Sequence, residues 1–188
     1  MTQIFDIAKQ WLISDGKEAP LVSFYFQNSA DFRVGLDRFT KTLTGLINSE
    51  NSQAIIAAVV GEIGNNSFDH NLGNWPDQPG VFFAFDEKER LVVLADRGQG
   101  VLTTLKTVRP ELDSDEKALK VAFSEVVTSR APEPRGNGLK FVRQVVANHD
   151  FVLDFYSGRA VIHLNDGLEP VIEATDILYN GCLAVFRF

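Results

Sequence analysis

Polar side chains recur at intervals of four residues between positions 62 and 70, and their types could carry chemistry. Glu62, Asn66 and His70 would share one stripe of a helix, because each step of four residues advances it by about 40° and 6 Å. A carboxamide oxygen is a neutral, hard ligand that suits Mg²⁺. A glutamate one turn earlier can orient or deprotonate a water or hydroxyl nucleophile. Taken alone, an ordinary polar helix rim explains the stripe as well.

A second cluster, Asp96-Arg97-Gly98-Gln99-Gly100, directly follows the apolar run 91–95. If that run is a strand, Asp96 lies at its tip, where a carboxylate can accept a hydrogen bond from an exocyclic amine such as that of adenine. The two glycines let the backbone turn sharply and approach a ligand closely. A simple turn built from ordinary turn residues remains the alternative.

A third cluster, Arg135-Gly136-Asn137-Gly138-Leu139, precedes a predicted amphipathic helix. Backbone N–H groups at such a helix start suit a phosphate oxygen, and Arg135 could add a charged contact. The pattern is neither a P-loop, which needs a following Gly-Lys-Ser/Thr, nor a dinucleotide fingerprint, which needs a third glycine. A flexible entry to the helix is the alternative.

The elements that must position these clusters follow from hydrophobic periodicity. We expect helices over 3–13 and 29–46, and a third helix that begins at Ser49 or Ser52 and carries the first cluster. Residues 73–80 have the composition of a loop. Further helices are expected near 114–128 and over 139–148, and strands over 21–26, 81–85, 90–95, 151–156, 159–164 and 182–188. Because strands cluster along the chain, we predict an α+β fold, a two-layer sandwich with helices on one face of a mixed, mostly antiparallel sheet.

The order of the three clusters resembles the nucleotide-binding domain of the GHKL superfamily, which DNA gyrase, the ninety-kilodalton heat-shock chaperone, sensor histidine kinases and mismatch-repair ATPases share. The N box would span Glu62 to His70, the G1 box Asp96 to Gly100 and the G2 box Gly136 to Leu139. The likeness covers about residues 30–188. The spacing of Glu62, Asn66 and His70 is especially similar to the stand-alone anti-sigma-factor serine kinases. The resemblance implies one histidine-kinase-like domain over 1–188, with a helix-and-strand extension over 1–28.

The resemblance also implies a cofactor set of ATP and Mg²⁺ and a role for each motif. Asn66 would hold the metal, Asp96 would accept from the adenine amine, Glu62 would act as general base, and residues 101–135 would form a lid over the nucleotide. The expected nucleotide-binding residues are Asn65, Asn66, His70, Asp96, Gly98, Gly100, Val101, Arg135, Gly136, Asn137, Gly138 and Leu139. One departure is Cys182, which stands where family members often carry a threonine near the adenine.

Composition narrows the classes of partner. The chain has 188 residues, 18 Lys and Arg against 25 Asp and Glu, and a formal net charge of −7. That balance argues against non-specific binding to nucleic acid or anionic membranes. The lone Cys182 cannot form an internal disulfide, and no apolar run approaches the roughly 20 residues of a membrane span. We therefore expect a cytoplasmic protein, either a monomer or a homodimer, with a regulatory protein partner.

Three functions stay open at this point. The first is a stand-alone regulatory protein kinase or anti-sigma-like partner-switching protein. The second is an ATPase switch whose lid closes on ATP. The third is a catalytically silent module that senses nucleotide. A self-contained histidine kinase is not expected from these residues, because the first histidine of the chain is His70, inside the N box.

Overall fold

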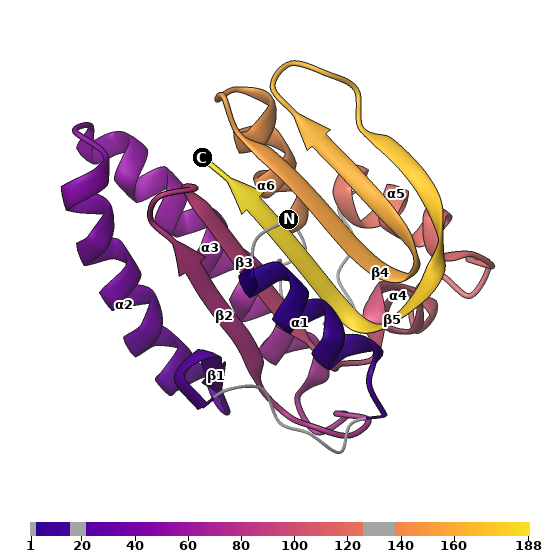
Figure 1. The fold of residues 1–188 in the computed structure, drawn as a ribbon. Coiled ribbons are helices and arrows are strands. Elements are labelled where there is room, and N and C mark those ends of the chain that lie inside the picture. The colour runs from indigo at the N-terminus through magenta and orange to yellow at the C-terminus, as the bar shows by residue number, and fades with distance from the viewer. Residues whose placement is uncertain (1–2, 16–21, 126–137) are drawn as a thin grey trace.

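The structure, a computed structural model, describes residues 3–15, 22–125 and 138–188. Within these residues the chain forms one sheet with a layer of helices against it (Figure 1). This architecture confirms the predicted α+β sandwich. Three residues of the expected site, Arg135, Gly136 and Asn137, lie outside the described residues.

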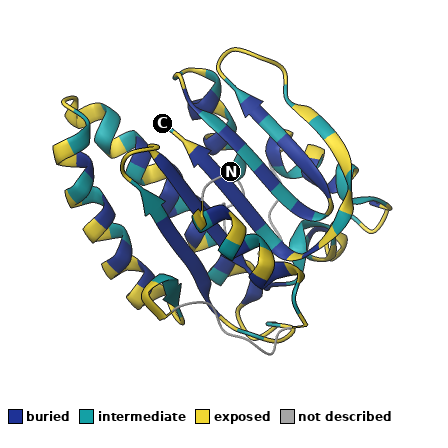
Figure 2. Cartoon of the chain, viewed as in Figure 1, coloured by how far each residue is buried: buried dark blue, intermediate teal, exposed yellow. Residues whose placement is uncertain are grey.

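The described strands pair in the order β1-β2-β3-β5-β4, and every neighbouring pair is antiparallel. Their bounds are Tyr25–Phe26 (β1), Val81–Asp86 (β2), Leu91–Asp96 (β3), Val152–Asn165 (β4) and Val171–Arg187 (β5). β2 and β3 form the expected hairpin, whose turn is fixed where Asp86 accepts hydrogen bonds from the N–H groups of Lys88 and Glu89, each at 3.0 Å. β3 lies at the centre of the sheet and is buried along its length (Figure 2).

Helices α2 (Ser29–Leu46), α3 (Glu50–Asn71), α5 (Asp115–Ser124) and α6 (Gly138–Ala147) bury their apolar stripes against one face of this sheet. The side chain of Asn28 caps α2 by accepting from the Asp31 N–H at 2.9 Å. Ser49, rather than Ser52, caps α3, because its Oγ accepts from the Ser52 N–H at 3.3 Å. Such caps satisfy N–H groups that have no partner within the helix.

Helix α1 (Gln3–Ile13) covers the opposite face of the sheet, which the sequence did not indicate. Figure 1 shows α1 lying across the sheet, and Phe5, Ala8, Trp11 and Leu12 pack there against side chains of β2, β3 and β5. β3 is therefore buried on both faces: Val92 and Leu94 face the helical layer, and Leu91, Val93 and Ala95 face α1. A strand that is buried on both faces reads as a continuous apolar run without alternation.

Several predicted strand bounds are wrong. Only Tyr25–Phe26 of the strand expected over 21–26 pairs with the sheet, and Val22–Phe24 form a 3-10 turn instead. The two strands expected over 151–156 and 159–164 are one strand, β4, with an irregularity in its pairing at Ser157 and Gly158. β5 begins at Val171, eleven residues before the expected start at Cys182. The missed segment is exposed along much of its length, so it lacks the hydrophobic pattern of a core strand.

The segment expected as a lid holds two helices in its described part. They are α4 (Gly100–Lys106) and α5, whose Leu119 and Phe123 lie in the main core with the Phe123 ring 5.3 Å from that of Phe155. A lid that opened through α5 would expose these side chains to water. The packing of α5 therefore argues against its moving as part of the expected lid.

Candidate functional site

Asp96 ends β3 with its side chain turned toward the helical layer, where α3 meets it. Its Oδ2 accepts a hydrogen bond of 2.7 Å from the Ser67 hydroxyl, and its Oδ1 accepts one of 2.8 Å from the Gly98 N–H. The residue is only 3% exposed. Burial raises the pKa of this carboxyl to about 6, although the bonds from Ser67 and Gly98 work to lower it. No cation among these partners compensates the charge. Titratable groups whose pKa is shifted in this way are common at functional sites.

Asn71, in the last turn of α3, locks the loop that follows Asp96. Its side chain donates to the Ser67 carbonyl and accepts from the Gln99 N–H, each at 2.8 Å. The carboxamide lies directly on Gly98, since a Cβ built there would come within 2.1 Å of Asn71 Nδ2. Gly98 is therefore needed for this close approach. The second predicted glycine, Gly100, opens α4, and the next N–H, of Val101, donates to Ser157 Oγ at 3.0 Å.

Glu62 and Asn66 lie earlier on α3 than Asn71, and both approach the start of α6. A Cβ built on Gly138 would lie 1.9 Å from Glu62 Oε1 and 3.1 Å from Asn66 Nδ2. A side chain at position 138 would have to push the flexible end of Glu62 aside, and the Glu62 carboxylate stands at the first residue of the helix. The positive end of the helix dipole stabilises an anion at that place. Two motifs separated by about 70 residues in the sequence are thus in contact.

The remaining predicted residues divide into two groups. Leu139 and Val101 are half-buried and pack against the main core, close to the groups described above. Asn65 and His70 are exposed on α3. The main chain of His70 does take part in the site, because its carbonyl accepts from Gln99 Nε2 at 3.3 Å.

Cys182 is the neighbour of Asp96 across the sheet, in the register that pairs β3 with β5. Its thiol donates to the Ser157 hydroxyl at a sulfur–oxygen distance of 3.7 Å. Burial, and after it the negative charge of Asp96, raise the pKa of the thiol well above its usual value. The thiol therefore stays protonated at neutral pH and acts as a small, weak donor beside the carboxylate.

Sequence reasoning missed the residues that hold the Asp96 loop. Ser67 and Asn71 could have been found on α3, because Ser67 follows Asn66 directly and Asn71 lies one turn later. Arg97 had a weaker signal: it separates two motif residues and was given no role. Its side chain leaves the loop on the face away from Asp96, is 4% exposed, and pairs with Asp77 at 2.6 Å.

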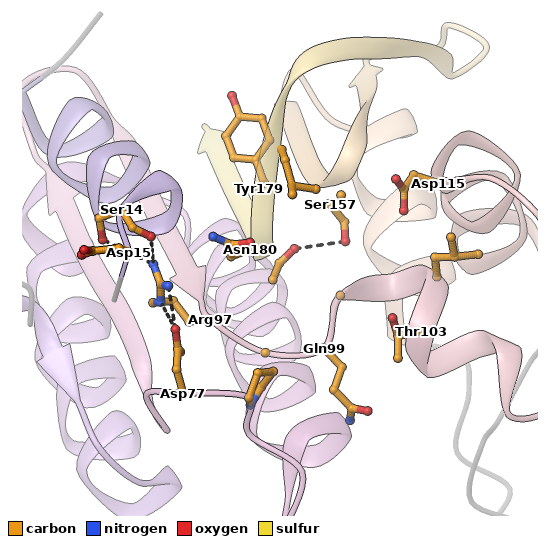
Figure 3. A pocket seen from close by; sticks show the side chains of 17 residues that line it. Ser14, Asp15, Asp77, Arg97, Gln99, Thr103, Asp115, Ser157, Tyr179 and Asn180 are labelled. Atoms are coloured by element: carbon orange, nitrogen blue, oxygen red, sulfur yellow. Dashed lines mark hydrogen bonds and ion pairs between the residues drawn. The ribbon is translucent and has the colours of Figure 1, made fainter. Parts of the chain in front are cut away.

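A cavity of about 590 Å³ opens on this outer side of the loop (Figure 3). Arg97, Gln99 and Thr103 form one side, and Ser157, Tyr179 and Asn180 another; Asp96 and Asn66 do not line it. Two of the predicted nucleotide-binding residues, Gly98 and Gly100, do line the cavity, so it lies beside the loop that follows Asp96.

The side chains near α3 determine how this site could bind Mg²⁺. Among the described residues no group of three or more His, Cys, Asp and Glu side chains could hold a metal ion. The residues that fit Mg²⁺ are Asn66, through its carboxamide oxygen, with Glu62 one turn away. An ion held by one amide takes its remaining oxygen ligands from phosphate groups and water, which is the usual arrangement of Mg²⁺ at nucleotide sites.

Comparison with known proteins does not assign the chain to a family. No model of a known protein family matches it, and no curated protein matches it significantly. Within its described part, no helix is long and apolar enough to cross a bilayer. The resemblance to the GHKL superfamily therefore stays a prediction from the sequence motifs.

Proposed function

We propose that the chain binds ATP together with Mg²⁺ between its helical layer and its sheet, and that it uses the nucleotide as a regulatory protein kinase. One observation carries the proposal. Asn66 contacts the start of α6, and the next residue, Ser67, contacts Asp96. Consecutive residues of one helix therefore link a candidate metal ligand to a candidate purine-reading carboxylate.

The carboxylate of Asp96 is the group that would recognise the purine. The Asp96 carboxylate accepts hydrogen bonds from the Ser67 hydroxyl and from the backbone N–H groups of Gly98 and Cys182, which leaves about one of its roughly four lone-pair positions for an exocyclic amine. A guanine presents a carbonyl oxygen where adenine presents that amine, and two acceptors facing each other would repel. We therefore expect ATP to bind more tightly than GTP.

The end of the proposed site at α6 is the candidate position for the phosphates. The N-terminus of α6 offers backbone N–H groups to anions, and Asn66 lies beside it with its amide. A bound Mg²⁺ would neutralise charge that develops on the transferred phosphoryl group. Glu62 is positioned to accept the proton of an attacking serine hydroxyl or water, since its carboxylate lies at the same helix start.

Binding is tested first, by isothermal titration of ATP and GTP in the presence of Mg²⁺. We expect ATP to be favoured, and Asn66→Asp to weaken Mg·ATP binding at least tenfold because it brings a second carboxylate toward the phosphates. Asn51→Asp is the matched control, an exposed residue in the first turn of the same helix. If Asn66→Asp binds like the wild type, Asn66 is not a metal ligand; if neither nucleotide binds, the proposal fails.

Chemistry is tested with labelled ATP and candidate protein partners. Label on a partner serine supports a kinase, free phosphate alone supports an ATPase switch, and tight binding without either product supports a nucleotide sensor. In the first two cases Glu62→Ala should slow turnover at least tenfold, about 1.4 kcal/mol in barrier, while it spares ATP binding. Glu87→Ala, in the exposed β2–β3 turn, is the control. Normal turnover of the Glu62 variant would assign Glu62 a structural role.

A further inference from the structure

Arg97 makes more contacts than a turn residue needs. Its Nε donates to Asp77 Oδ2 at 2.8 Å, and its Nη1 donates to the carbonyls of Leu12 at 3.3 Å and Ser14 at 3.2 Å, and to that of Trp11. Figure 3 shows the guanidinium between Asp77 and Ser14, at the wall of the outer cavity. One side chain thus joins the loop after β3 to α1 and to the loop after α3.

These contacts form a cap for α1. The last carbonyls of a helix have no partner within it, and a cation at this end is stabilised by the helix dipole. Arg97 supplies both the donors and the charge, and Asn180 Nδ2 adds a bond of 2.9 Å to the Leu12 carbonyl. The position of α1 on the outer face of the sheet therefore depends on a residue of the Asp96 loop.

The same loop is held from the other face by α3. Asp96, directly before Arg97, accepts a hydrogen bond from Ser67, and Gln99, two residues after Arg97, donates its N–H to Asn71. A shift of this short segment cannot keep both sets of hydrogen bonds, and a buried guanidinium that leaves its partners loses much of its stabilisation. A ligand that fixes the inner side of the loop must then also favour the contacts on its outer side.

We propose that Arg97 is a positioning residue for the nucleotide site and couples nucleotide binding to the docking of α1 on the far face of the sheet. The nucleotide half of this statement rests on the proposed function. The mechanical half, from α3 through the loop to α1, does not depend on any ligand. By reciprocity, a partner that pulls α1 from the sheet would weaken nucleotide binding.

The chain carries its own reporter of α1. The sequence has two tryptophans. Trp11, near the end of α1, is buried between this helix and the sheet, and its indole N–H donates to Gln78 Oε1 at 2.9 Å. The other, Trp75, lies in the loop after α3, so Trp75→Phe leaves Trp11 as the only tryptophan, whose fluorescence can be excited selectively over that of the three tyrosines. Acrylamide quenching of Trp11 and hydrogen exchange of residues 3–13 both read how firmly α1 is docked.

The ligand-free arm tests the mechanical half. Asn71→Ala removes one of the two inner holds on the loop, the bond from the Gln99 N–H, without touching α1, and we expect it to raise Trp11 quenching and to speed exchange in α1 at least threefold. Val145→Ala, on α6, is the control, since it loosens the core away from the loop. If a folded Asn71→Ala protein shows the wild-type Trp11 signal, the two faces of the loop are not coupled and the proposal is overturned.

The nucleotide arm tests the other half in the full-length protein. Saturating Mg·ATP should slow α1 exchange in the wild type, and Arg97→Met should abolish this slowing and weaken ATP binding at least tenfold. Arg97→Lys, which keeps the charge but cannot reach both Asp77 and the carbonyls, should give an intermediate affinity. Binding of ATP without any change in α1 would overturn the proposal. Lack of ATP binding by the wild type would instead overturn the proposed function, while the ligand-free arm still decides the coupling.

Discussion

The two faces of the loop 96–100 differ in whether a buried charge has an oppositely charged partner. The inner face is the one toward α3, and the outer face is the one toward α1. On the inner face the Asp96 carboxylate is buried among neutral donors, and burial raises its pKa to about 6. On the outer face partial burial works to raise the pKa of Asp77, but the bonds and the charge of Arg97 hold it below its usual value. The outer charge is compensated and serves structure. The inner charge has only neutral donors around it, which costs stability when the carboxyl is ionised.

The largest test of this difference is on the outer face. Arg97→Met removes the partner of Asp77 and leaves the carbonyls at the end of α1 without donors. Because Asp77 is 37% exposed and can be rehydrated, we expect a loss of about 2–4 kcal/mol rather than the upper range for buried pairs. Urea unfolding followed by circular dichroism measures it. A loss below about 0.5 kcal/mol would show that Arg97 is not a structural anchor.

On the inner face we expect removal of the charge to stabilise the fold at neutral pH. The pKa of Asp96 is raised from 3.8 to about 6, so the folded protein keeps a proton that the unfolded chain releases over this range. This contribution to stability is present below about pH 4 and is lost as the pH rises through about 6.

Asp96→Asn removes that charge while a carboxamide can keep bonds to Ser67 and Gly98. We expect it to raise the unfolding free energy at pH 7.5 by about 1–2 kcal/mol, less than the roughly 3 kcal/mol that a shift of two pKa units sets as a ceiling. The gain should shrink at pH 5.5. Urea unfolding at the two pH values checks it, and a destabilised variant at pH 7.5 would contradict the view of Asp96 as an uncompensated charge.

The smallest expected effect concerns ligand binding on the inner face. If the ionised Asp96 accepts from the adenine amine, ATP affinity should fall about fourfold between pH 7 and pH 5.5, since only about a quarter of a group with a pKa near 6 is ionised at the lower pH. Titration calorimetry in one buffer system measures this, with Asp96→Asn as the control that should lack the pH dependence. An equal pH dependence in the variant would assign the effect to another group.

Much of the site could be predicted because it depends on local chemistry. The interval of four residues that joins Glu62 to Asn66 fixes their shared stripe on any helix, and an apolar run that ends at Asp96 places that residue at a strand end. Capping chemistry predicted the starts of α2 and α3 within a residue or two, since Asn28 and Ser49 satisfy their own first turns.

What could not be predicted involves partners far away in the sequence. Arg97 and the α1 carbonyls that it caps are 83 to 86 residues apart, and no periodicity relates them. The early start of β5 could not be predicted for the same reason. Its segment 171–181 is largely exposed, and it forms a strand because it pairs with β4.

By itself the sequence determined which face of its own helix or strand each side chain occupies, because that depends only on the repeat of the backbone. It therefore determined the three motifs and the α+β class. Only the tertiary structure decided that α1 covers the far side of the sheet, that Gly138 meets Glu62, and that Arg97 faces away from Asp96. These contacts depend on how the elements pack together, and a given apolar stripe can pack on either face of a sheet.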